Sequence, residues 1–352
     1  MIAPGATIGI LGGGQLGRML SMAAAQLGYK CHIFDPHDAP CATHVAAAHT
    51  RAAFDDVAAL ERFGRGVDVV TYEFENVPVE PLKVLADKLH PSTRSLAVAQ
   101  DRAREKEFLE QTGARVAPWR AVATLADVQS AVAELGLPLV LKTRRYGYDG
   151  KGQAWIRSAD EAAEAWSAIG EQPAVAEAGI DFAAEFSVIV ARWADGRHSF
   201  WDSGENEHGD GILRRSTVPC SEAVAVQVAE ARAAALRIAE ALDHVGVLTV
   251  EFFASADGPL VNEIAPRVHN SGHWTIEGAV TSQFEQHIRA ICGLPPGITG
   301  LVRGGAVMDN LIGDDVDRWP ELVAQRGAHV HIYGKGDARP GRKMGHVTRV
   351  KR

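Results

Sequence analysis

The sequence has few cysteines and lacks any long apolar run. Its four cysteines are widely scattered, and no pair has the spacing of a metal site or a redox motif: Cys31, Cys41, Cys220 and Cys292. We therefore expect unpaired packing thiols and a reducing compartment, the cytoplasm. No apolar run approaches the length that crosses a bilayer, and the N-terminus lacks the basic and apolar segments of a secretory signal. We expect no contact with a membrane.

Positive charge is also in short supply. The 352 residues include 36 Lys and Arg against 44 Asp and Glu, which gives a formal net charge of −8. This balance disfavours binding along a nucleic acid backbone, although it leaves room for a local basic pocket. The hydrophobic share of 46% is that of an ordinary globular protein. The length suffices for two or three domains.

The stretch most indicative of function is Leu139–Gln153, LVLKTRRYGYDGKGQ. Its apolar start predicts a buried strand that ends at Lys142. The loop that follows carries three glycines, whose backbone amides can approach an anion closely, and a lysine adds a point charge. We interpret the loop as a mobile flap over a polyphosphate. An ordinary glycine-rich hairpin turn is the alternative.

A glycine motif lies near the N-terminus between two predicted strands, Thr7–Leu11 and Tyr29–Phe34. The motif is GGGQLG at residues 12–17, and a helix is expected over Arg18–Gln26. With Asp35 about 20 residues further on, this pattern predicts a dinucleotide site and hence a nicotinamide-dependent dehydrogenase. The glycine loop by itself supplies only a tight turn and a helix N-terminus, which favour any anion. Both interpretations stay open at this point.

Acidic residues follow the next predicted strand, Val67–Tyr72. Polar groups beyond the carboxyl ends of parallel strands line the ligand sites of open α/β sheets, so Glu73 and Glu75 are candidates for binding. A solvated loop explains at least one of them equally well. Further along we expect a polar loop at Asp202–Arg215 and four helices, the third opened by a capping box of Ser158 and Glu161. These helices are Gln100–Gln111, Ala123–Leu135, one from Ser158, and Ser221–His244. On the first, Arg102 and Lys106 share a face that is usually only a solvated stripe.

A predicted hairpin carries two acids in otherwise apolar strands, Val247–Phe253 and Leu260–Ile264. A three-residue loop at 256–258, which we favour, or a five-residue loop at 255–259 sets Glu251 and Glu263 opposite each other on one face. A two-residue loop at 257–258 would set them on opposite faces. Paired carboxylates repel each other, and Mg²⁺ between them removes that cost. Two acids splayed into solvent are the alternative.

Two polar stretches near the C-terminus have little periodicity. The first, PRVHNSGHWT at residues 266–275, concentrates recognition groups that suit a polar small molecule: Arg267, His269, Asn270 and His273. The second, Arg339–Lys343, is basic and could hold a phosphate monoester or form an exposed basic loop.

Together these motifs resemble the N5-carboxyaminoimidazole ribonucleotide synthetases, an ATP-grasp family of purine biosynthesis. The segments that carry the resemblance occur in order over nearly the whole chain: GGGQLGRML, YEFENV, KTRRYGYDGKGQ, DGILRRSTVP, NEIAPRVHNSGHWT and RPGRKMGH. The resemblance implies a mixed α/β ATP-grasp fold. It implies a Rossmann-like domain at 1–98, a linker helix and small flap domain at 99–180, a catalytic domain at 181–297, and a β-rich C-terminal subdomain at 298–352.

The resemblance also implies an activity. ATP and bicarbonate would carboxylate 5-aminoimidazole ribonucleotide through carboxyphosphate, giving ADP and phosphate, with ATP and Mg²⁺ as cofactors and a cytoplasmic homodimer as the enzyme. The rivals are a sister ATP-grasp ligase, such as a formate-dependent glycinamide ribonucleotide transformylase or a biotin carboxylase, the dehydrogenase above, and a catalytically silent nucleotide-binding protein.

Site residues follow from the resemblance. ATP would contact Arg102, Lys142, Gly147, Tyr148, Asp149, Gly150, Lys151, Gly152, Gln153, Glu177, Ala178, Gly179, Ile180, Glu185, His208, Asn262 and Glu263. Mg²⁺ would lie on Glu251 and Glu263. The ribonucleotide would contact Gln15, Glu73, Asp149, Arg267, His269, Asn270, Lys335 and Arg342. Catalysis would involve Lys142, Asp149, Arg267 and His269, with Asp149 orienting the reacting amine or taking its proton.

Overall fold

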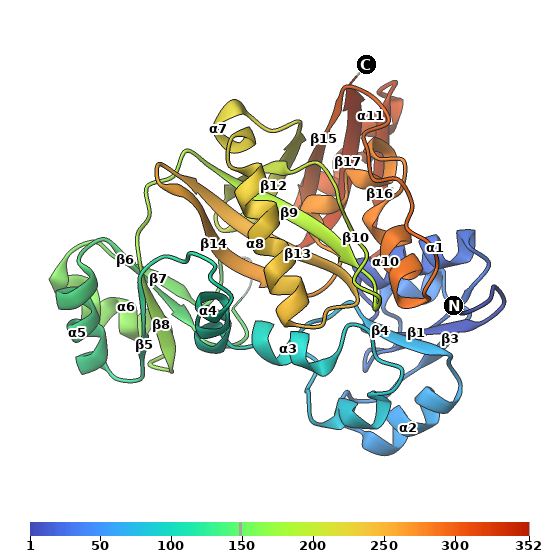
Figure 1. The fold of residues 1–352 in the computed structure, drawn as a ribbon, viewed down its shortest axis with the longest axis horizontal. Helices are drawn as coiled ribbons and strands as arrows, with labels where there is room; N and C mark the ends of the chain where they lie inside the picture. Colours follow the sequence, from blue (N-terminus) through green and yellow to red (C-terminus); the bar gives the residue numbers. More distant parts are fainter. Residues whose placement is uncertain (148–149, 352) are drawn as a thin grey trace.

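The computed structural model describes residues 1–147 and 150–351, so Tyr148 and Asp149 of the predicted flap lie outside the described residues. The described chain forms three β-sheets with helices around them (Figure 1). In Figure 1 the small sheet lies at the left, the N-terminal sheet at the lower right and the largest sheet between them. None of the described helices is long and apolar enough to span a membrane.

The N-terminal sheet is parallel and has the order β3-β2-β1-β4, as in nucleotide-binding α/β folds. The strands predicted there are confirmed, although the helix begins at Gln15 rather than Arg18. The elements are β1 Thr7–Leu11, α1 Gln15–Gln26, β2 Lys30–Phe34, β3 Ala48–Thr50, α2 Val57–Arg65 and β4 Val69–Tyr72.

The small sheet is antiparallel, in the order β5-β8-β6-β7, and packs against two helices. Its elements are β5 Trp119–Val122, α5 Leu125–Leu135, β6 Leu139–Thr143, β7 Gln153–Ile156, α6 Ala162–Ala168 and β8 Ala174–Ala178. Helix α5 is capped at both ends, because Thr124 and Asp127 form a capping box and Gly136 follows the last turn at φ +79°. The capping box predicted at Ser158 is wrong. The Glu161 carboxylate accepts instead from the N–H of Arg157, and a 3₁₀ turn precedes α6.

The largest sheet has nine strands in the order β14-β13-β9-β11-β12-β15-β17-β16, with β10 paired to β9. The strands are β9 Ala184–Arg192, β10 His198–Phe200, β11 Gly204–Gly209, β12 Ile212–Val218, β13 Gly246–Ser255, β14 Gly258–Ala265, β15 Gly305–Ile312, β16 Ala328–Ile332 and β17 Lys343–Lys351. Strand β17 begins at the end of the basic segment and was not predicted.

Two sequence predictions fail in this region. The stretch Asp202–Arg215 is not a loop, because β11 and β12 pair as a hairpin that turns at Asp210 and Gly211, both at positive φ. Polar residues of this hairpin are buried between charged ones, as Asn206 is between Glu205 and Glu207. The helix expected over Ser221–His244 is divided into α7 Glu222–Ala225 and α8 Val228–Ala241.

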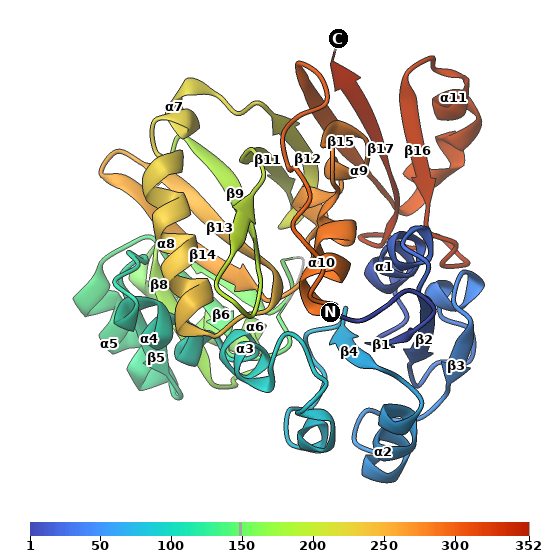
Figure 2. The ribbon, with the colours of Figure 1, turned by 45° about the vertical axis from the view of Figure 1, so that its right-hand side comes forward.

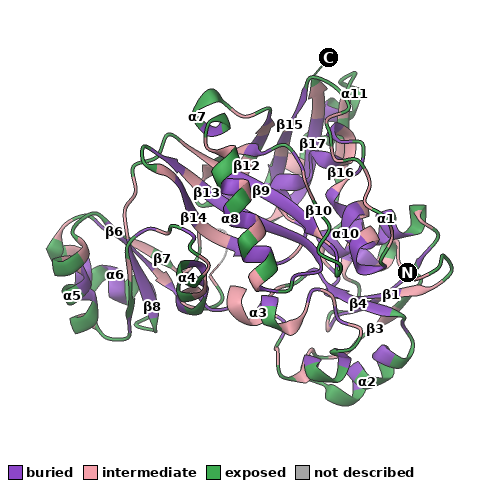
Figure 3. Ribbon diagram, in the orientation of Figure 1, coloured by how far each residue is buried: buried purple, intermediate pink, exposed green. Residues whose placement is uncertain are grey.

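Of the remaining helices, two connect the N-terminal sheet to the small sheet, and three lie between strands of the largest sheet. They are α3 Thr93–Ala99, α4 Arg102–Gln111, α9 Thr275–Gly278, α10 Gln283–Ile291 and α11 Trp319–Ala324. Helix α1 of the N-terminal region lies beside α10, and one hydrophobic core runs through both (Figure 2). Buried residues fill the strands of the large and N-terminal sheets, whereas exposed residues gather on the outer helices (Figure 3). The N-terminal sheet is therefore fixed against the large sheet.

A buried histidine links these two sheets. On α10, the Nδ1 atom of His287 accepts from the Val247 N–H at 3.1 Å, so its Nε2–H donates to the Thr71 hydroxyl at 2.8 Å. His287 has no exposed surface, and burial lowers its pKa from 6.5 to about 3. The imidazole is thus neutral and joins β4 to β13.

We predict that His287 makes the fold sensitive to acid. Below pH 6.5 the unfolded chain takes up a proton that the folded chain excludes, so the free energy of unfolding falls by about 1.4 kcal/mol per pH unit for this group. His287→Gln can keep both hydrogen bonds without titrating. When the free energy of unfolding in urea is plotted against pH between 6 and 4.5, the slope for this variant should be smaller than that of the wild type by that amount. The exposed His198→Gln is the control, and an unchanged slope in His287→Gln contradicts the prediction.

Candidate active site

Two acids face each other across the β13–β14 hairpin, with Glu251 directly opposite Glu263. The predicted pairing is confirmed, but the predicted loop is wrong. The turn has two residues, 256 and 257, which alone would pair Glu251 with Asn262. A β-bulge between Glu251 and Phe252 shifts the register by one residue and sets Glu263 opposite Glu251.

The two carboxylates repel each other and are held by cationic or donor groups. Burial, followed by the charge of Glu263, raises the pKa of Glu251 to about 7. Although burial acts in the opposite direction, Arg102 and Lys142 lower the pKa of Glu263. Arg102 contacts Glu263 at 2.9 Å, and His269 Nε2 contacts Glu251 at 3.1 Å. The pair is therefore a site of concentrated negative charge.

This donor set fits a hard divalent cation. Asn262 precedes Glu263 on the same strand, and its amide oxygen accepts from Lys142 at 3.4 Å. Mg²⁺ prefers a few carboxylate or amide oxygens together with nucleotide phosphates. Within residues 1–147 and 150–351, no three His, Cys, Asp or Glu side chains converge on one metal position. The remaining ligands would have to come from the bound nucleotide and water.

A cationic cluster lies next to the acids. Lys142 on β6 contacts Glu177 on β8 at 3.0 Å and the Asn262 side chain at 3.4 Å. Although burial acts in the opposite direction, Lys106 and Lys142 lower the pKa of Glu177 to about 2. With Arg102 nearby, these charges form a surface suited to phosphate oxygens.

The solvated face expected for α4 is wrong for Lys106. Its side chain is fully buried, lies 3.3 Å from Glu177 and donates to the Asn262 carbonyl at 3.0 Å. Its neighbour Glu105 is also buried and accepts from the Ile264 N–H at 2.6 Å. Sequence reasoning missed both, because a pair of charges on a helix gives no sign of what packs against it.

The loop between β6 and β7 lies close to Arg102, the partner of Glu263, and to the β11–β12 turn. A Cβ on Gly147 would lie 3.9 Å from Arg102, and one on Gly150 would lie 2.7 Å from the Asp210 carbonyl oxygen. Gly152, at φ +72°, leaves no room beside the Thr143 hydroxyl. Lys151 follows Gly150 in this loop, and Gln153 begins β7. The described part of the predicted flap is thus close to the cluster.

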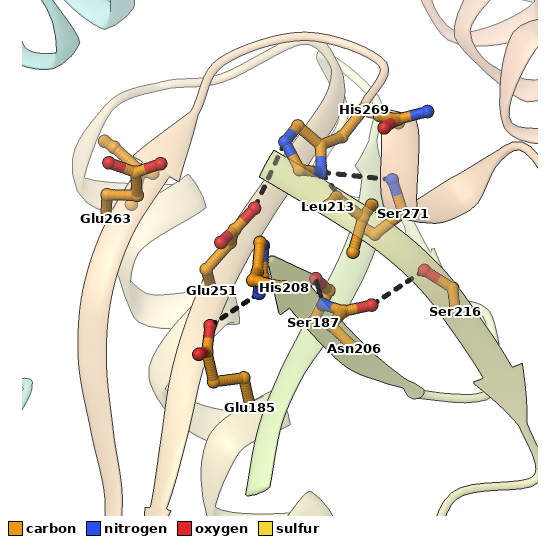
Figure 4. Close-up of polar contacts among 12 residues, drawn as sticks. Glu185, Ser187, Asn206, His208, Leu213, Ser216, Glu251, Glu263, His269 and Ser271 are labelled. Carbon is orange, nitrogen blue, oxygen red and sulfur yellow. Dashed lines mark hydrogen bonds and ion pairs between the residues drawn. The ribbon is translucent and has the colours of Figure 1, made fainter. Parts of the chain in front are cut away.

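The segment Glu177–Ile180, predicted to contact ATP, spans the end of β8. Ala178 and Gly179 donate their N–H groups to the carbonyls of Pro118 and Pro138, both at 2.8 Å. These two N–H groups serve the fold, so adenine would have to use other groups of the Glu177–Ile180 segment. Glu185 on β9 contacts His208 on β11 at 2.8 Å, and this contact raises the pKa of His208 although burial opposes it. Figure 4 shows Glu251 between that pair and His269, with Glu263 on the neighbouring strand.

The N-terminal glycine loop is occupied by the protein's own acids. The Asp35 carboxylate accepts from the Gly13 N–H at 2.8 Å, and Glu73 accepts from the Gly14 N–H at 2.7 Å. A Cβ on Gly12 or Gly14 would lie 2.8 Å from Glu73. The amides that would meet a dinucleotide pyrophosphate are therefore engaged, and Asp35 serves the loop rather than a ribose.

The residues predicted for the ribonucleotide border this loop. Gln15 is the first residue of α1 and is partly buried, and Glu73 is almost fully buried. Arg267 forms an ion pair with Glu75 at 2.9 Å. From the C-terminal segment, Lys335 lies over the Tyr333 ring, and burial lowers its pKa to about 8 while Glu73 and Cys41 act against this. Arg342 donates to the Asp337 carbonyl at 3.1 Å.

Asn270 lies in the turn between β14 and α9, next to His269. Its carboxamide forms two hydrogen bonds with that of Asn310 on β15, at 2.9 and 2.7 Å. Asn310 was not identified from the sequence, where it lies unremarkably within a strand. The pair ties the His269 turn to the largest sheet.

Three family models together match most of the chain. The ATP-grasp domain matches residues 107–284, the ribonucleotide synthetase preATP-grasp domain matches 5–100, and the phosphoribosylaminoimidazole carboxylase C-terminal domain matches 306–352.

Individual relatives match over nearly their full length. The N5-carboxyaminoimidazole ribonucleotide synthase of Brucella melitensis is 50% identical over 99% of this chain and 98% of its own. A crystal structure of an N5-carboxyaminoimidazole ribonucleotide synthetase with ADP has a TM-score of 0.95, 41% identity, and covers 100% of this chain and 94% of its own. The Aspergillus clavatus enzyme with ADP and 5-aminoimidazole ribonucleotide has a TM-score of 0.92, 32% identity, and covers 98% and 94%.

We predict that Glu251→Gln stabilises the ligand-free protein at alkaline pH. A pKa raised to about 7 means that ionised Glu251 costs stability above that pH, and the cost disappears as the pH falls and the carboxyl is protonated. Differential scanning fluorimetry at pH 8 should show a melting temperature roughly 2–6 °C higher, with a smaller difference at pH 5.5. The exposed Glu240→Gln should change neither value, and a destabilised Glu251→Gln at pH 8 contradicts the prediction.

Proposed function

Because this chain belongs to the N5-carboxyaminoimidazole ribonucleotide synthases of the ATP-grasp family, we propose that the cluster around Glu251 and Glu263 is its active site. The protein is an ATP-dependent carbon–nitrogen ligase. It carboxylates 5-aminoimidazole ribonucleotide with bicarbonate, releasing ADP and phosphate, in purine biosynthesis. The observation that carries the site assignment is the convergence of the paired acids with Lys142, Lys106 and Arg102.

We propose that ATP binds between the small sheet and the β13–β14 hairpin. Lys142 and Arg102 lie where they can neutralise the phosphates, because each already contacts a carboxylate of this cluster. A bound polyphosphate would exchange those partners for phosphate oxygens. The predicted contacts from Glu177 to Ile180, and those of Glu185 and His208, would then hold the adenosine end.

Mg²⁺ is proposed at Glu251 and Glu263, with Asn262 beside them. Bound there, it would supply positive charge against the phosphate oxygens, which is the main requirement of phosphoryl transfer. The raised pKa of Glu251 supports this assignment, since a carboxylate that is buried and lies beside the charge of Glu263 is stabilised by a nearby cation.

Bicarbonate is proposed to attack the γ-phosphorus and give carboxyphosphate. This intermediate hydrolyses readily, so water must be kept out while the amine reacts. The glycine-rich loop can do this because Gly150 already lies against the Asp210 carbonyl of the β11–β12 turn. The loop therefore has a docking surface in the largest sheet.

The ribonucleotide is proposed to lie between the N-terminal glycine loop and the His269 turn. Arg267 and His269 would meet the base, and Lys335 and Arg342 would hold the phosphate. His269 is neutral, because burial keeps its pKa well below 6.5, and its Nε2–H donates to Glu251. Asp149, which we propose orients the amine or accepts its proton, lies outside the described residues.

We also propose a domain division, a cellular location and an oligomeric state. For the four-part division at 1–98, 99–180, 181–297 and 298–352, the gaps between the three family-model matches support the first and last boundaries. The boundary at 180 is supported by the separation of the small sheet from the largest sheet. A cytoplasmic location is supported by four cysteines without disulfides. The homodimer rests on family resemblance alone.

We predict that ADP release requires both 5-aminoimidazole ribonucleotide and bicarbonate. A coupled ADP assay should show release that saturates with the ribonucleotide, with a KM in the range of about 1 µM to 1 mM. Carbon-labelled bicarbonate should appear in an acid-labile product. Faster release with formate and glycinamide ribonucleotide would favour the transformylase, and no response to any acceptor would favour a silent nucleotide-binding protein.

We predict that Lys335→Ala and Arg342→Ala each raise the KM for the ribonucleotide. Losing one charged hydrogen bond to a phosphate costs about 1.5–3 kcal/mol, which corresponds to roughly tenfold to hundredfold. The KM for ATP should stay unchanged, because these two residues are assigned to the ribonucleotide and the Lys142 cluster is assigned to ATP. Arg339→Ala is the control, since Arg339 is exposed in the same segment. Equal effects on both substrates would contradict these assignments.

A further inference from the structure

The side chain of Gln283 holds the main chain of His269. Gln283 is the first residue of α10 and is fully buried. Its Oε1 atom accepts from the His269 N–H at 2.9 Å, and its Nε2 group donates to the His269 carbonyl at 2.6 Å. The same Nε2 group lies 3.3 Å from Nδ1 of His273. Both the oxygen and the NH₂ group of the carboxamide are therefore hydrogen-bonded to the His269 main chain.

These contacts allow only one orientation of the carboxamide. A flipped amide would face an N–H with an NH₂ and a carbonyl with a carbonyl. The His269 ring is fixed from the other side, because Nδ1 accepts from the Ser271 hydroxyl at 2.9 Å and Nε2 contacts Glu251 at 3.1 Å. Because the main chain and the ring of His269 are both held by hydrogen bonds, the imidazole is fixed in one orientation.

Packing around Gln283 leaves it no freedom to move. A Cβ on Gly272 would lie 2.7 Å from the Gln283 side chain and 2.6 Å from Ile189. The Gln283 N–H also donates to the Thr275 hydroxyl at 3.0 Å. Residues 269–275 and the start of α10 thus form one rigid unit.

We propose that Gln283 is a positioning residue of the carboxylation, setting the imidazole of His269 against Glu251 and the substrate amine. The inference rests on the proposed function, in which His269 meets the ribonucleotide. Gln283 does not itself touch a substrate. Its effect passes through the hydrogen bonds to the His269 main chain.

The chain offers a closely matched control in Gln286, one turn further along α10. Gln286 is equally buried, and its carboxamide also clamps a main chain, donating to the Gly297 carbonyl and accepting from the Gly297 N–H, both at 2.9 Å. It donates as well to the Ser199 hydroxyl at 2.9 Å. The Gly297 contacts hold the segment between α10 and β15 instead of the active site.

The test compares Gln283→Met with Gln286→Met. Each variant replaces a carboxamide that hydrogen-bonds a main-chain N–H and carbonyl with an apolar side chain of similar length. Both should lose similar thermal stability. Only Gln283→Met should lower kcat/KM for the ribonucleotide, by roughly tenfold to hundredfold as expected for a misplaced catalytic group. The KM for ATP should be unchanged in both. Should Gln283→Met not fold, Gln283→Glu keeps the shape and the acceptor, loses the donor, and should lower the same ratio.

A second measurement reads His269 directly. Nitrogen NMR of the wild type, with His269 assigned by its loss in His269→Gln, should show one tautomer with the proton on Nε2. Gln283→Met should show averaged ring nitrogens, and Gln286→Met should match the wild type. Equal losses in the two Met variants, or normal ribonucleotide kinetics in Gln283→Met, would overturn the inference. A wild type that ignores the ribonucleotide would instead refute the proposed function.

Discussion

The structure depends on bringing two like charges together in a place where little water can screen them. Glu251 and Glu263 lie opposite each other on paired strands, and the pKa of Glu251 at about 7 shows what that arrangement costs. The protein offsets part of the cost with groups from other regions, namely Arg102 from α4 and His269 from the turn after β14. Because the two carboxylates repel each other in the empty site, a cation and its phosphates bind more strongly there, since the cation removes this repulsion.

This constraint explains why the small sheet and helix α4 converge on one hairpin of the largest sheet. The small sheet contributes Lys142 and Glu177, the helix between the first two regions contributes Arg102 and Lys106, and the largest sheet contributes the acids. The fixed contact of α1 with α10 then brings the N-terminal glycine loop to the other side of the His269 turn. The proposed ATP site and the proposed ribonucleotide site can thus meet at His269 and Arg267.

Much of this could be predicted from the sequence, and the failures have physical causes. Apolar runs located β1, β2 and β4 of the N-terminal sheet and β6 of the small sheet, because each of these strands is largely buried, whereas the short, polar β3 was missed. The pairing of Glu251 with Glu263 was predicted correctly for an incorrect reason, since a bulge at the site, rather than a longer turn, restores the register. A bulge has no local sequence signal. Lys106 and Gln283 were missed because their burial comes from segments far away in the chain, and the β11–β12 hairpin was missed because its polar residues line a site.

The N-terminal glycine motif shows why such a pattern indicates a backbone shape and not a ligand. The strand, tight turn and helix predicted from Gly12, Gly14 and Gly17 are all present. However, the amides that the motif exposes bind Asp35 and Glu73 from the ends of the neighbouring strands. Once these carboxylates fill the anion site, a pyrophosphate would meet like charge where it needs a donor. The motif then serves to hold Glu73 rigidly at the edge of the sheet, with its pKa raised by burial, facing Lys335 and Arg267. A geometry that binds dinucleotides in other proteins here positions an acid, and its function follows from what fills the loop.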